Sequence, residues 1–273
     1  MSRLFVFGLG YTARAIVRES GWPFLATTRD GRDGTIRFDD AEAVRAGLAI
    51  STHVLSSVPP DEGGDPVLDR YGDALGGRWL GYLSSTGVYG DAGGAWVDET
   101  TPIRGRRANR NAADAAWLSL EARVFRLPGI YGPGRSPLDR VAAGQAHRTG
   151  IAGQVFSRVH VDDIARGVVA GFDGPAGAYN LADDLPTSQD EVIEHAARLL
   201  GVAPPPLVAL DTLSPMARAF YAENRRVANG KAKRVLGWRP LYADYRLGLR
   251  AVSATISPAP ASSAPPAASG DQR

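Results

Sequence analysis

The chain has 273 residues, a length that fits one large α/β domain with an embedded lobe, or two modest domains that share an interface. It contains no cysteine, which excludes disulfides, thiolate metal sites and a cysteine nucleophile. Its 31 basic and 29 acidic residues leave a formal net charge of only +2, so the overall charge gives no indication of nucleic-acid binding.

The start of the chain predicts a strand, a tight glycine turn and a helix in one unbroken unit. Residues 4–7 form an apolar run that is typical of a parallel strand covered by helices on both faces. Gly8 and Gly10 end this run, apolar residues recur at helical spacing from Ala13 onward, and Gly21 is placed to end the helix. The resulting pattern is G-x-G-x-x-A.

This pattern predicts a site for the pyrophosphate of a dinucleotide cofactor. Gly8 lets the chain turn sharply off the strand, and Gly10 has no Cβ that would block the phosphates. The unpaired N–H groups of the first helical turn, with the positive end of the helix dipole, bind an anion without any side-chain charge. The residues expected to contact the cofactor here are Gly8, Gly10, Tyr11, Thr12 and Ala13. The alternative is a tight turn in an ordinary α/β domain.

The strand predicted at residues 24–27 ends where a dinucleotide-binding fold usually contacts the adenosine ribose. An acidic residue at this place binds the 2′-hydroxyl of NAD, whereas an arginine binds the 2′-phosphate of NADP. Thr28 and Arg29 come first and Asp30 follows. We therefore expect Thr28 and Arg29 to contact the cofactor and the cofactor to be NADP, with NAD as the alternative because Asp30 is so close.

Strands and helices continue to alternate after this point. Strands are predicted at residues 35–38, 53–56 and 79–83, and helices at residues 41–48 and 66–75. Asp39 is the expected N-cap of the first of these helices, and Pro66 takes a first-turn position in the second. Ser57 lies in the loop that follows the strand at 53–56, and we expect this loop to border the cofactor.

The segment SSTGVYGD, residues 84–91, resembles the extended short-chain dehydrogenase/reductase superfamily, which includes NAD-dependent epimerases and dehydratases that act on sugar nucleotides. Further similar segments follow in the family's own order: FRLPGIYGPGR (125–135), VHVDDIARGV (159–168), GAYNLADDLPTSQDEVI (177–193) and KAKRVLGWRP (231–240). The resemblance implies an α/β fold, a Rossmann-like doubly wound parallel sheet within residues 1–255. It also implies a small C-terminal substrate lobe, drawn chiefly from residues 133–160 and 182–250.

The chain departs from the family pattern at two places. Extended members usually show T-G-x-x-G-x-x-G at the first turn, so the G-x-G-x-x-A of this chain indicates an atypical branch. In the family, a serine after the fifth strand binds the substrate oxygen and a tyrosine transfers the proton. A lysine four residues later lowers the pKa of that tyrosine and holds the nicotinamide ribose. Ser85 matches the family serine, and its neighbour Ser84 is a further expected cofactor contact.

Arginines stand where the family has its tyrosine and lysine. When Asp114 is matched to a common family glutamate, the tyrosine position falls on Arg106 and the lysine position on Arg110. Another loop length would move these positions to Arg104 and Ala108, so neither alignment contains Tyr-x-x-x-Lys. Arginine stays protonated at physiological pH, so it can stabilise charge but cannot donate and recover a proton. The predicted catalytic residues are therefore Ser85, Arg106 and Arg110.

Other side chains are candidates for the missing proton donor and for substrate contacts. Tyr89, Tyr131 and Asp91 are conceivable donors, although both tyrosines belong to V-Y-G and I-Y-G turns where the ring more often packs than reacts. The residues expected to contact the substrate are Thr86, Tyr89, Tyr131 and Arg135. The arginine-rich run at residues 104–107 is either a solvated loop or a phosphate contact. Nucleic-acid binding is disfavoured because no aromatic platform accompanies the run.

The histidines and loop carboxylates do not predict a metal site. The four histidines show no metal-like spacing, and we expect His53 to lie in the core. Asp162 is the expected N-cap of the helix that follows His160. Asp98 and Glu99 adjoin the expected pocket and act there as a carboxylate pair, or else belong to a solvated loop.

Taken together, these features favour an NADP-dependent oxidoreductase that acts on a small molecule. A non-catalytic NADP-binding sensor would explain the lost tyrosine and lysine, and a sugar-nucleotide epimerase or dehydratase is the third hypothesis. No segment resembles a membrane span or an export signal, so we expect a cytoplasmic protein with neither membrane nor nucleic-acid partners. A homodimer is compatible with the sequence. Residues 256–273 are rich in Ser, Pro and Ala, and we expect a disordered tail there.

Overall fold

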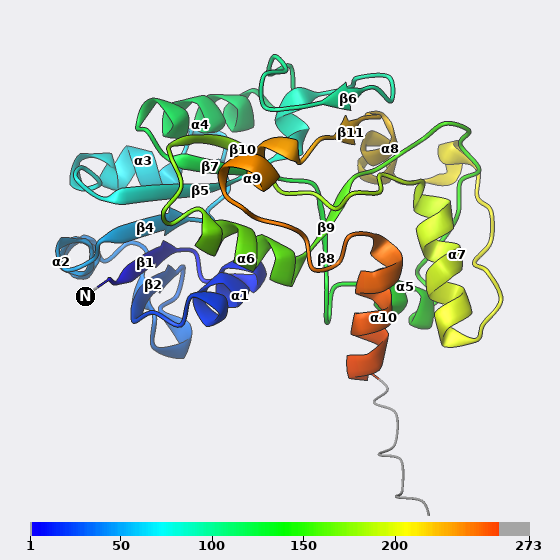
Figure 1. The fold of residues 1–273 in the computed structure, drawn as a ribbon, viewed down its shortest axis with the longest axis horizontal. Helices are drawn as coiled ribbons and strands as arrows, with labels where there is room; N and C mark the ends of the chain where they lie inside the picture. The colour runs from blue at the N-terminus through cyan, green and yellow to red at the C-terminus, as the bar shows by residue number, and fades with distance from the viewer. Residues whose placement is uncertain (1, 257–273) are drawn as a thin grey trace, which may run out of the picture.

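The structure, a computed structural model, describes residues 2–256, so all but the first residue of the expected tail lies outside the described residues (Figure 1). At its centre is a seven-stranded sheet in which every neighbouring pair is parallel. From one edge to the other the strands are β10 (Gly177–Asn180), β7 (Arg123–Leu127), β5 (Trp79–Ser85), β4 (His53–Ser56), β1 (Leu4–Phe7), β2 (Phe24–Thr28) and β3 (Ile36–Arg37).

The strand order reverses between β1 and β4. From β1 the chain proceeds outward to β2 and β3, whereas from β4 it proceeds in the opposite direction to β5, β7 and β10. This arrangement is the Rossmann-like doubly wound sheet that the sequence predicted. In such sheets ligands bind beyond the carboxyl ends of the strands, next to the point of reversal.

Helices cover both faces of the sheet, and β1 shows why the sequence requires this. Leu4 and Val6 are buried in one apolar cluster with side chains of α1 (Tyr11–Ser20) and α6 (Val161–Ala170). Phe5 and Phe7 are buried in another cluster, with side chains of α2 (Ala41–Ala49), α3 (Pro66–Tyr71) and α4 (Ala108–Ser119). Because successive strand residues point to opposite faces, a strand covered on both sides must be apolar at every position.

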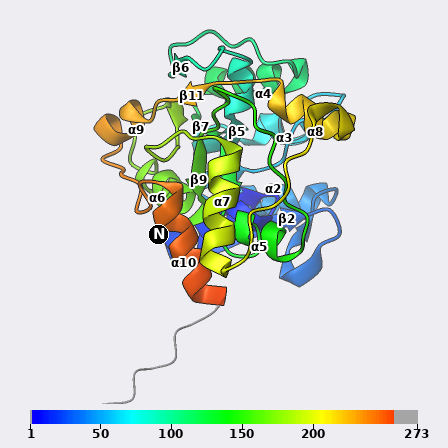
Figure 2. The same ribbon diagram turned by 90° about the vertical axis from the view of Figure 1, so that its right-hand side faces the viewer.

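A smaller group of elements lies beyond one end of the sheet (Figures 1 and 2). Its helices α5 (Pro137–Ala142), α7 (Gln189–Leu200) and α10 (Tyr245–Ile256) share one apolar cluster. Two short parallel pairs complete it: β8 (Gly129–Tyr131) with β9 (Arg158–His160), and β6 (Trp96–Val97) with β11 (Arg226–Val227). The remaining helical segments are α8 (Pro215–Tyr221), α9 (Gly230–Val235), η1 (Arg32–Gly34), η2 (Gly72–Ala74), η3 (Thr86–Tyr89) and η4 (Leu210–Thr212). Among the described residues, no helix has the length and apolar character needed to cross a membrane.

Two predicted helix caps are wrong. Asp40, not Asp39, caps α2 by accepting from the N–H of Ala43, because Arg37 Nε and Nη2 hold the Asp39 carboxylate at 3.0 and 2.9 Å. Likewise His160 replaces Asp162 as the cap of α6: its Nδ1 accepts from the Asp162 N–H at 3.2 Å. In both cases the residue that caps the helix lies within two positions of the predicted one.

Other local predictions are confirmed. Gly21 ends α1 with a left-handed φ of +61°, and Pro66 opens α3 behind the N-cap Asp65. His53 packs in β4 against the rings of Trp22, Trp79 and Phe172, although it is only half-buried.

Candidate functional site

The glycine turn after β1 leads directly into α1, whose first backbone N–H groups have no partner within the helix. Gly8 has a left-handed φ of +81°, its N–H donates to Thr27 Oγ1, and its carbonyl accepts from Ser57 Oγ at 2.5 Å. Gly10 is the N-cap of α1, and no side chain caps this helix. A Cβ added at Gly10 would meet no other heavy atom within 4 Å. The space in front of the first turn of α1 is therefore open, and these residues fit the pyrophosphate of a dinucleotide.

The other residues predicted to contact the cofactor lie near this turn and differ in burial and in hydrogen-bond partners. Tyr11 donates its hydroxyl to the Pro133 carbonyl at 3.1 Å, and Ala13 is fully buried between helix and sheet. At the end of β2, Thr28 is buried and its hydroxyl bonds to Asp30 and Thr35, whereas Arg29 is exposed. No hydrogen bond or ion pair joins the Arg29 side chain to the described part of the chain. Its guanidinium is thus available to a ligand.

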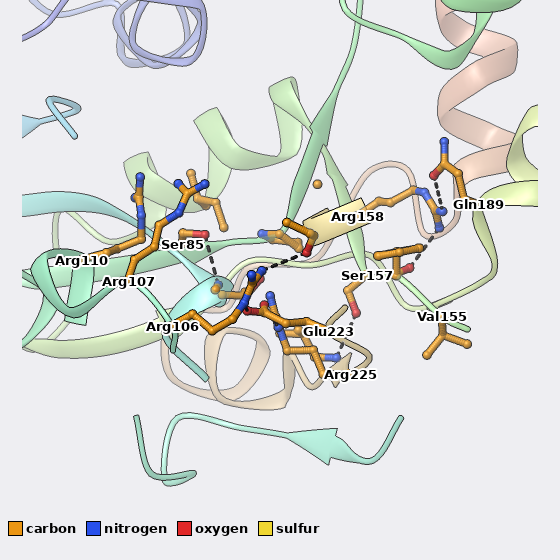
Figure 3. Close-up of a pocket in the computed structure, with 18 residues that line it drawn as sticks. Ser85, Arg106, Arg107, Arg110, Val155, Ser157, Arg158, Gln189, Glu223 and Arg225 are labelled. Atoms are coloured by element: carbon orange, nitrogen blue, oxygen red, sulfur yellow. Dashed lines mark hydrogen bonds and ion pairs between the residues drawn. The ribbon is translucent and has the colours of Figure 1, made fainter. Parts of the chain in front are cut away.

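A cavity of about 490 Å³ lies beyond the carboxyl ends of β5 and β7 (Figure 3). It is enclosed by the start of α4, by β9 and by the segment around α8 and β11. The residues that sequence reasoning placed in the chemistry and that line it are Ser85, Thr86, Arg106 and Arg110. Lining residues that sequence reasoning missed are Arg158, Gln189, Glu223 and Arg225, which come from segments more than 70 positions after Ser85 in the chain.

Ser85 presents its hydroxyl to this cavity. Its Oγ accepts a hydrogen bond from the Gly87 N–H at 3.1 Å and caps η3, so its own proton is free to be donated to a bound molecule. Ser84, one residue earlier, points to the other side of the strand. It is buried and donates to Asp114 Oδ2 at 2.6 Å, which directs it into the interior instead of toward a cofactor.

A buried polar network lies behind Ser85 and accounts for Tyr89. Arg126 donates to both carboxylate oxygens of Asp114, at 3.1 and 2.7 Å, and to the Tyr89 hydroxyl at 3.0 Å. The Tyr89 hydroxyl in turn donates to Asn180 Oδ1 at 2.7 Å. Burial raises the pKa of Tyr89, and its ring does not line the cavity. The prediction that Tyr89 contacts substrate therefore disagrees with its placement, because its hydroxyl already satisfies buried partners. Arg126 is a charged residue within the mostly apolar strand β7, and this feature of the sequence could have predicted a buried polar network.

The other candidate proton donors also lie away from the cavity. Tyr131 is buried in the lobe against Gly248 and burial raises its pKa, while Asp91 accepts from the Asn224 and Gly93 N–H groups. Arg135 is exposed and lies 5.9 Å from the centre of the Tyr11 ring, near the start of α1. The structure thus does not bring Tyr131, Asp91 or Arg135 to the cavity.

The loop carboxylates do not form a pair at the cavity. Asp98 accepts from the backbone and hydroxyl of Thr100, and Glu99 accepts from the Asn180 N–H at 2.7 Å. Within residues 2–256, no cluster of three or more His, Cys, Asp or Glu side chains is arranged to hold a metal ion.

Glu223 is the one acidic side chain among the described residues that line the cavity. Its Oε1 accepts from Arg106 Nε and its Oε2 from Arg225 Nη1, each at 2.6 Å. Burial disfavours the carboxylate, but the hydrogen bonds from these two guanidinium groups outweigh it and hold the pKa of Glu223 below its usual range. Glu223 is therefore an ionised partner for arginine and not a proton donor near neutral pH.

The chain is similar to known proteins over most of its length. No protein-family model matches it. A 3-diazoavenalumate denitrifying reductase from Streptomyces sp is 32% identical over 240 residues, which cover 83% of this chain and 72% of that protein. A solved structure of a conserved protein of unknown function from Silicibacter pomeroyi is 42% identical, with a TM-score of 0.86 over 93% of this chain and 99% of the other. The NAD complex of a dTDP-glucose 4,6-dehydratase from Bacillus anthracis has a TM-score of 0.75 at 16% identity, over 93% of this chain and 96% of the other.

Proposed function

Because the chain belongs to the NAD-dependent epimerase/dehydratase family of the short-chain dehydrogenase/reductase superfamily, we propose that it is an NAD(P)-dependent oxidoreductase that reduces a small organic molecule. The observation that carries the proposal is the position of Ser85. Its free hydroxyl faces the cavity at the carboxyl ends of the strands, on the same edge of the sheet as the glycine turn. The related protein from Streptomyces sp is itself named a reductase.

We assign the following roles to residues of this chain. Backbone amides of the first turn of α1, at residues 11–13, bind the coenzyme pyrophosphate, and the exposed Arg29 binds the 2′-phosphate, which makes NADP the proposed coenzyme. The reduced coenzyme, when bound, supplies a hydride. Ser85 donates a hydrogen bond to the reacting group and so stabilises the negative charge that develops there.

No tyrosine, lysine or histidine is found among the described residues that line the cavity. We therefore propose that water supplies the proton after hydride transfer. General acid–base assistance typically contributes about a hundredfold to ten-thousandfold in rate, so a substrate that needs a strong acid would react slowly here. The site suits a substrate that is already polarised enough to accept hydride with hydrogen-bonding help alone.

Coenzyme binding and turnover test the proposal separately. Calorimetric titration with NADPH, NADH and their oxidised forms should give the tightest binding for an NADP form, and purified protein should oxidise NADPH when a library of small electrophilic compounds is added. NADP binding without turnover on any compound would indicate the non-catalytic sensor. Coenzyme that co-purifies tightly and is unchanged after a turnover would instead indicate an epimerase or dehydratase. If calorimetry gives no heat with any pyridine coenzyme, the proposal is wrong.

A further inference from the structure

The cavity carries more positive charge than its own residues neutralise. Five arginines line it, and Glu223 is the one lining carboxylate among the described residues. Two of the five, Arg106 and Arg225, share that carboxylate. The remaining three have no carboxylate within 4.0 Å in the described part of the chain; they are Arg107, Arg110 and Arg158.

Arg158 gives the cavity wall a fixed charge. It is buried, and its two terminal nitrogens donate to four uncharged oxygens, namely the carbonyls of Phe156, Thr187 and Ser188 and the Gln189 side chain. Burial lowers the pKa of Arg158 to about 10, so the group is still protonated at neutral pH. The carboxylate of Asp183 acts on Arg158 from beyond ion-pair distance and raises its pKa, so Arg158 adds only partly balanced positive charge to this wall.

Arg107 and Arg110 provide the groups that can hold such an anion. Arg107 is the N-cap residue of α4, and Arg110 lies in the first turn of that helix. In Figure 3 both guanidinium groups lie at the end of the cavity that holds Ser85, whereas Arg158 and Gln189 lie at the other end. Arg107 is exposed and Arg110 half-buried, so a ligand can reach both.

The coenzyme does not account for this charge. Its pyrophosphate is proposed to bind at residues 11–13, and none of these residues is among those that line the cavity. The charge on Arg107 and Arg110 is therefore left for the second ligand of the site.

We infer that the substrate of this cavity is a small organic anion, whose carboxylate or phosphate is bound by Arg107 and Arg110 next to Ser85. This inference rests on the proposed function for the statement that the ligand is a substrate. Each guanidinium can grip an oxyanion with two parallel hydrogen bonds, which fixes its orientation as well as its position. The bound anion then holds the reducible part of the molecule against the Ser85 hydroxyl.

Three probes that share a phenyl ring test the inference: benzoate, phenyl phosphate and benzamide, the uncharged analogue of benzoate. Each is titrated calorimetrically into the full-length protein at constant ionic strength, with and without saturating NADP, because salt screens exposed charge. We expect at least one of the two anions to bind at least tenfold more tightly than benzamide. The stronger of the two identifies carboxylate or phosphate as the natural group.

Matched variants locate the site. Arg107→Gln and Arg110→Gln should each weaken binding of that anion by about tenfold or more, which corresponds to the loss of a hydrogen bond to a charged group. Arg104→Gln is the control, because Arg104 is an exposed arginine of the same loop that does not line the cavity, and it should bind the anion like wild type. Melting temperatures close to that of wild type would show that the variants are folded. Equal binding of benzamide and both anions, or unchanged anion binding in both cavity variants, would overturn the inference.

The same titrations separate this inference from the proposed function. If NADP binds but wild type and the cavity variants bind the anions with equal affinity, the proposed anion site is wrong while the oxidoreductase proposal stands. If the anions bind as expected but no coenzyme binds, the cavity is an anion site and the oxidoreductase proposal is wrong.

Discussion

Arg106 Nε lies 2.6 Å from Glu223 Oε1, although 117 positions separate the two residues in the chain. Arg106 Nη2 also donates to the Ala219 carbonyl at 2.9 Å. The residue that stands at the family's tyrosine position thus connects the loop before α4 to the end of the segment that contains α8. These two contacts hold one wall of the cavity against the other, so a structural role for Arg106 is added to the predicted catalytic one.

The first prediction concerns the unequal cost of breaking this contact. Arg106→Ala should lower the free energy of unfolding by less than about 1 kcal/mol, because the Arg106 side chain is 57% exposed and surface ion pairs contribute little. Glu223→Ala should cost about 2 kcal/mol, because it also leaves the largely buried Arg225 without a charged partner. Urea unfolding of both variants measures the difference. A larger loss for Arg106→Ala than for Glu223→Ala would contradict the assignment of Glu223 as the shared partner.

A second prediction separates two neighbouring serines. Ser85→Ala should lower turnover by about a hundredfold to a thousandfold, which is typical for removal of one donor to a developing negative charge, while coenzyme binding is kept. Ser84→Ala should instead lower stability by about 1–3 kcal/mol, because Asp114 loses a buried hydrogen-bond donor. Steady-state kinetics and thermal melting of both variants provide the comparison. If Ser85→Ala turns over as fast as wild type, Ser85 is not in the chemistry.

The third prediction uses the two glycines of the first turn. Gly8→Ala should destabilise the protein by about 1–2 kcal/mol, because residue 8 has a left-handed φ and the new Cβ would lie only 3.0 Å from Ser57 Oγ. Gly10→Val should cost only about 1 kcal/mol, the usual loss when an apolar residue takes an N-cap position, because its φ of −86° is open to any residue and its Cβ meets no neighbour. Its side chain would instead occupy the proposed pyrophosphate site, so the coenzyme-induced rise in melting temperature should disappear. A coenzyme shift of normal size in Gly10→Val would place the pyrophosphate elsewhere.

Coenzyme preference is the subject of the fourth prediction. Arg29→Ala should weaken NADP binding by about tenfold to a hundredfold, the usual worth of a hydrogen bond to a charged group, and should leave NAD binding unchanged. Arg14→Ala is a suitable control, since Arg14 belongs to the neighbouring α1 and is already paired with Asp33 at 2.7 Å. Calorimetric affinities of both proteins for both coenzymes decide the matter. An equal loss for NAD and NADP would show that Arg29 does not read the 2′-phosphate.

The fifth prediction concerns pH and the cap of α6. His160 accepts the Asp162 N–H through Nδ1, which requires the neutral ring, and burial lowers its pKa below the usual value of about 6.5. As pH falls below that value the unfolded chain binds a proton that the folded chain does not, so stability is lost as pH falls from about 7 toward the lower folded-state pKa. His160→Asn keeps a capping side chain without this titration and should therefore lose less stability between pH 7 and pH 5.

Melting temperatures of both proteins across this range test the effect. His53 and His195 also have lowered pKa values, and they contribute equally to wild type and variant, so the difference between the two curves belongs to His160. Parallel curves would mean that His160 does not titrate in this window.

The sequence determined the sheet and the glycine turn, and it identified Ser85 and Arg110 as candidate site residues. All of these depend on patterns within a few residues. An apolar run of four fixes a strand covered on both faces, and a glycine after it fixes the turn, whatever lies farther away. The segments of the family pattern added their order, and that order fixed the fold.

Only the tertiary structure decided which polar side chains face the cavity. Ser84 and Ser85 are indistinguishable in sequence, and the pleat of β5 turns one toward Asp114 and the other toward the cavity. Arg106 and Arg110 belong to the same arginine-rich segment, yet Glu223 pairs with Arg106 and leaves Arg110 free of any ion pair in the described structure. A hydrogen bond or ion pair is decided by which groups meet in space, and those groups come from segments more than a hundred residues apart, a separation that no local pattern encodes.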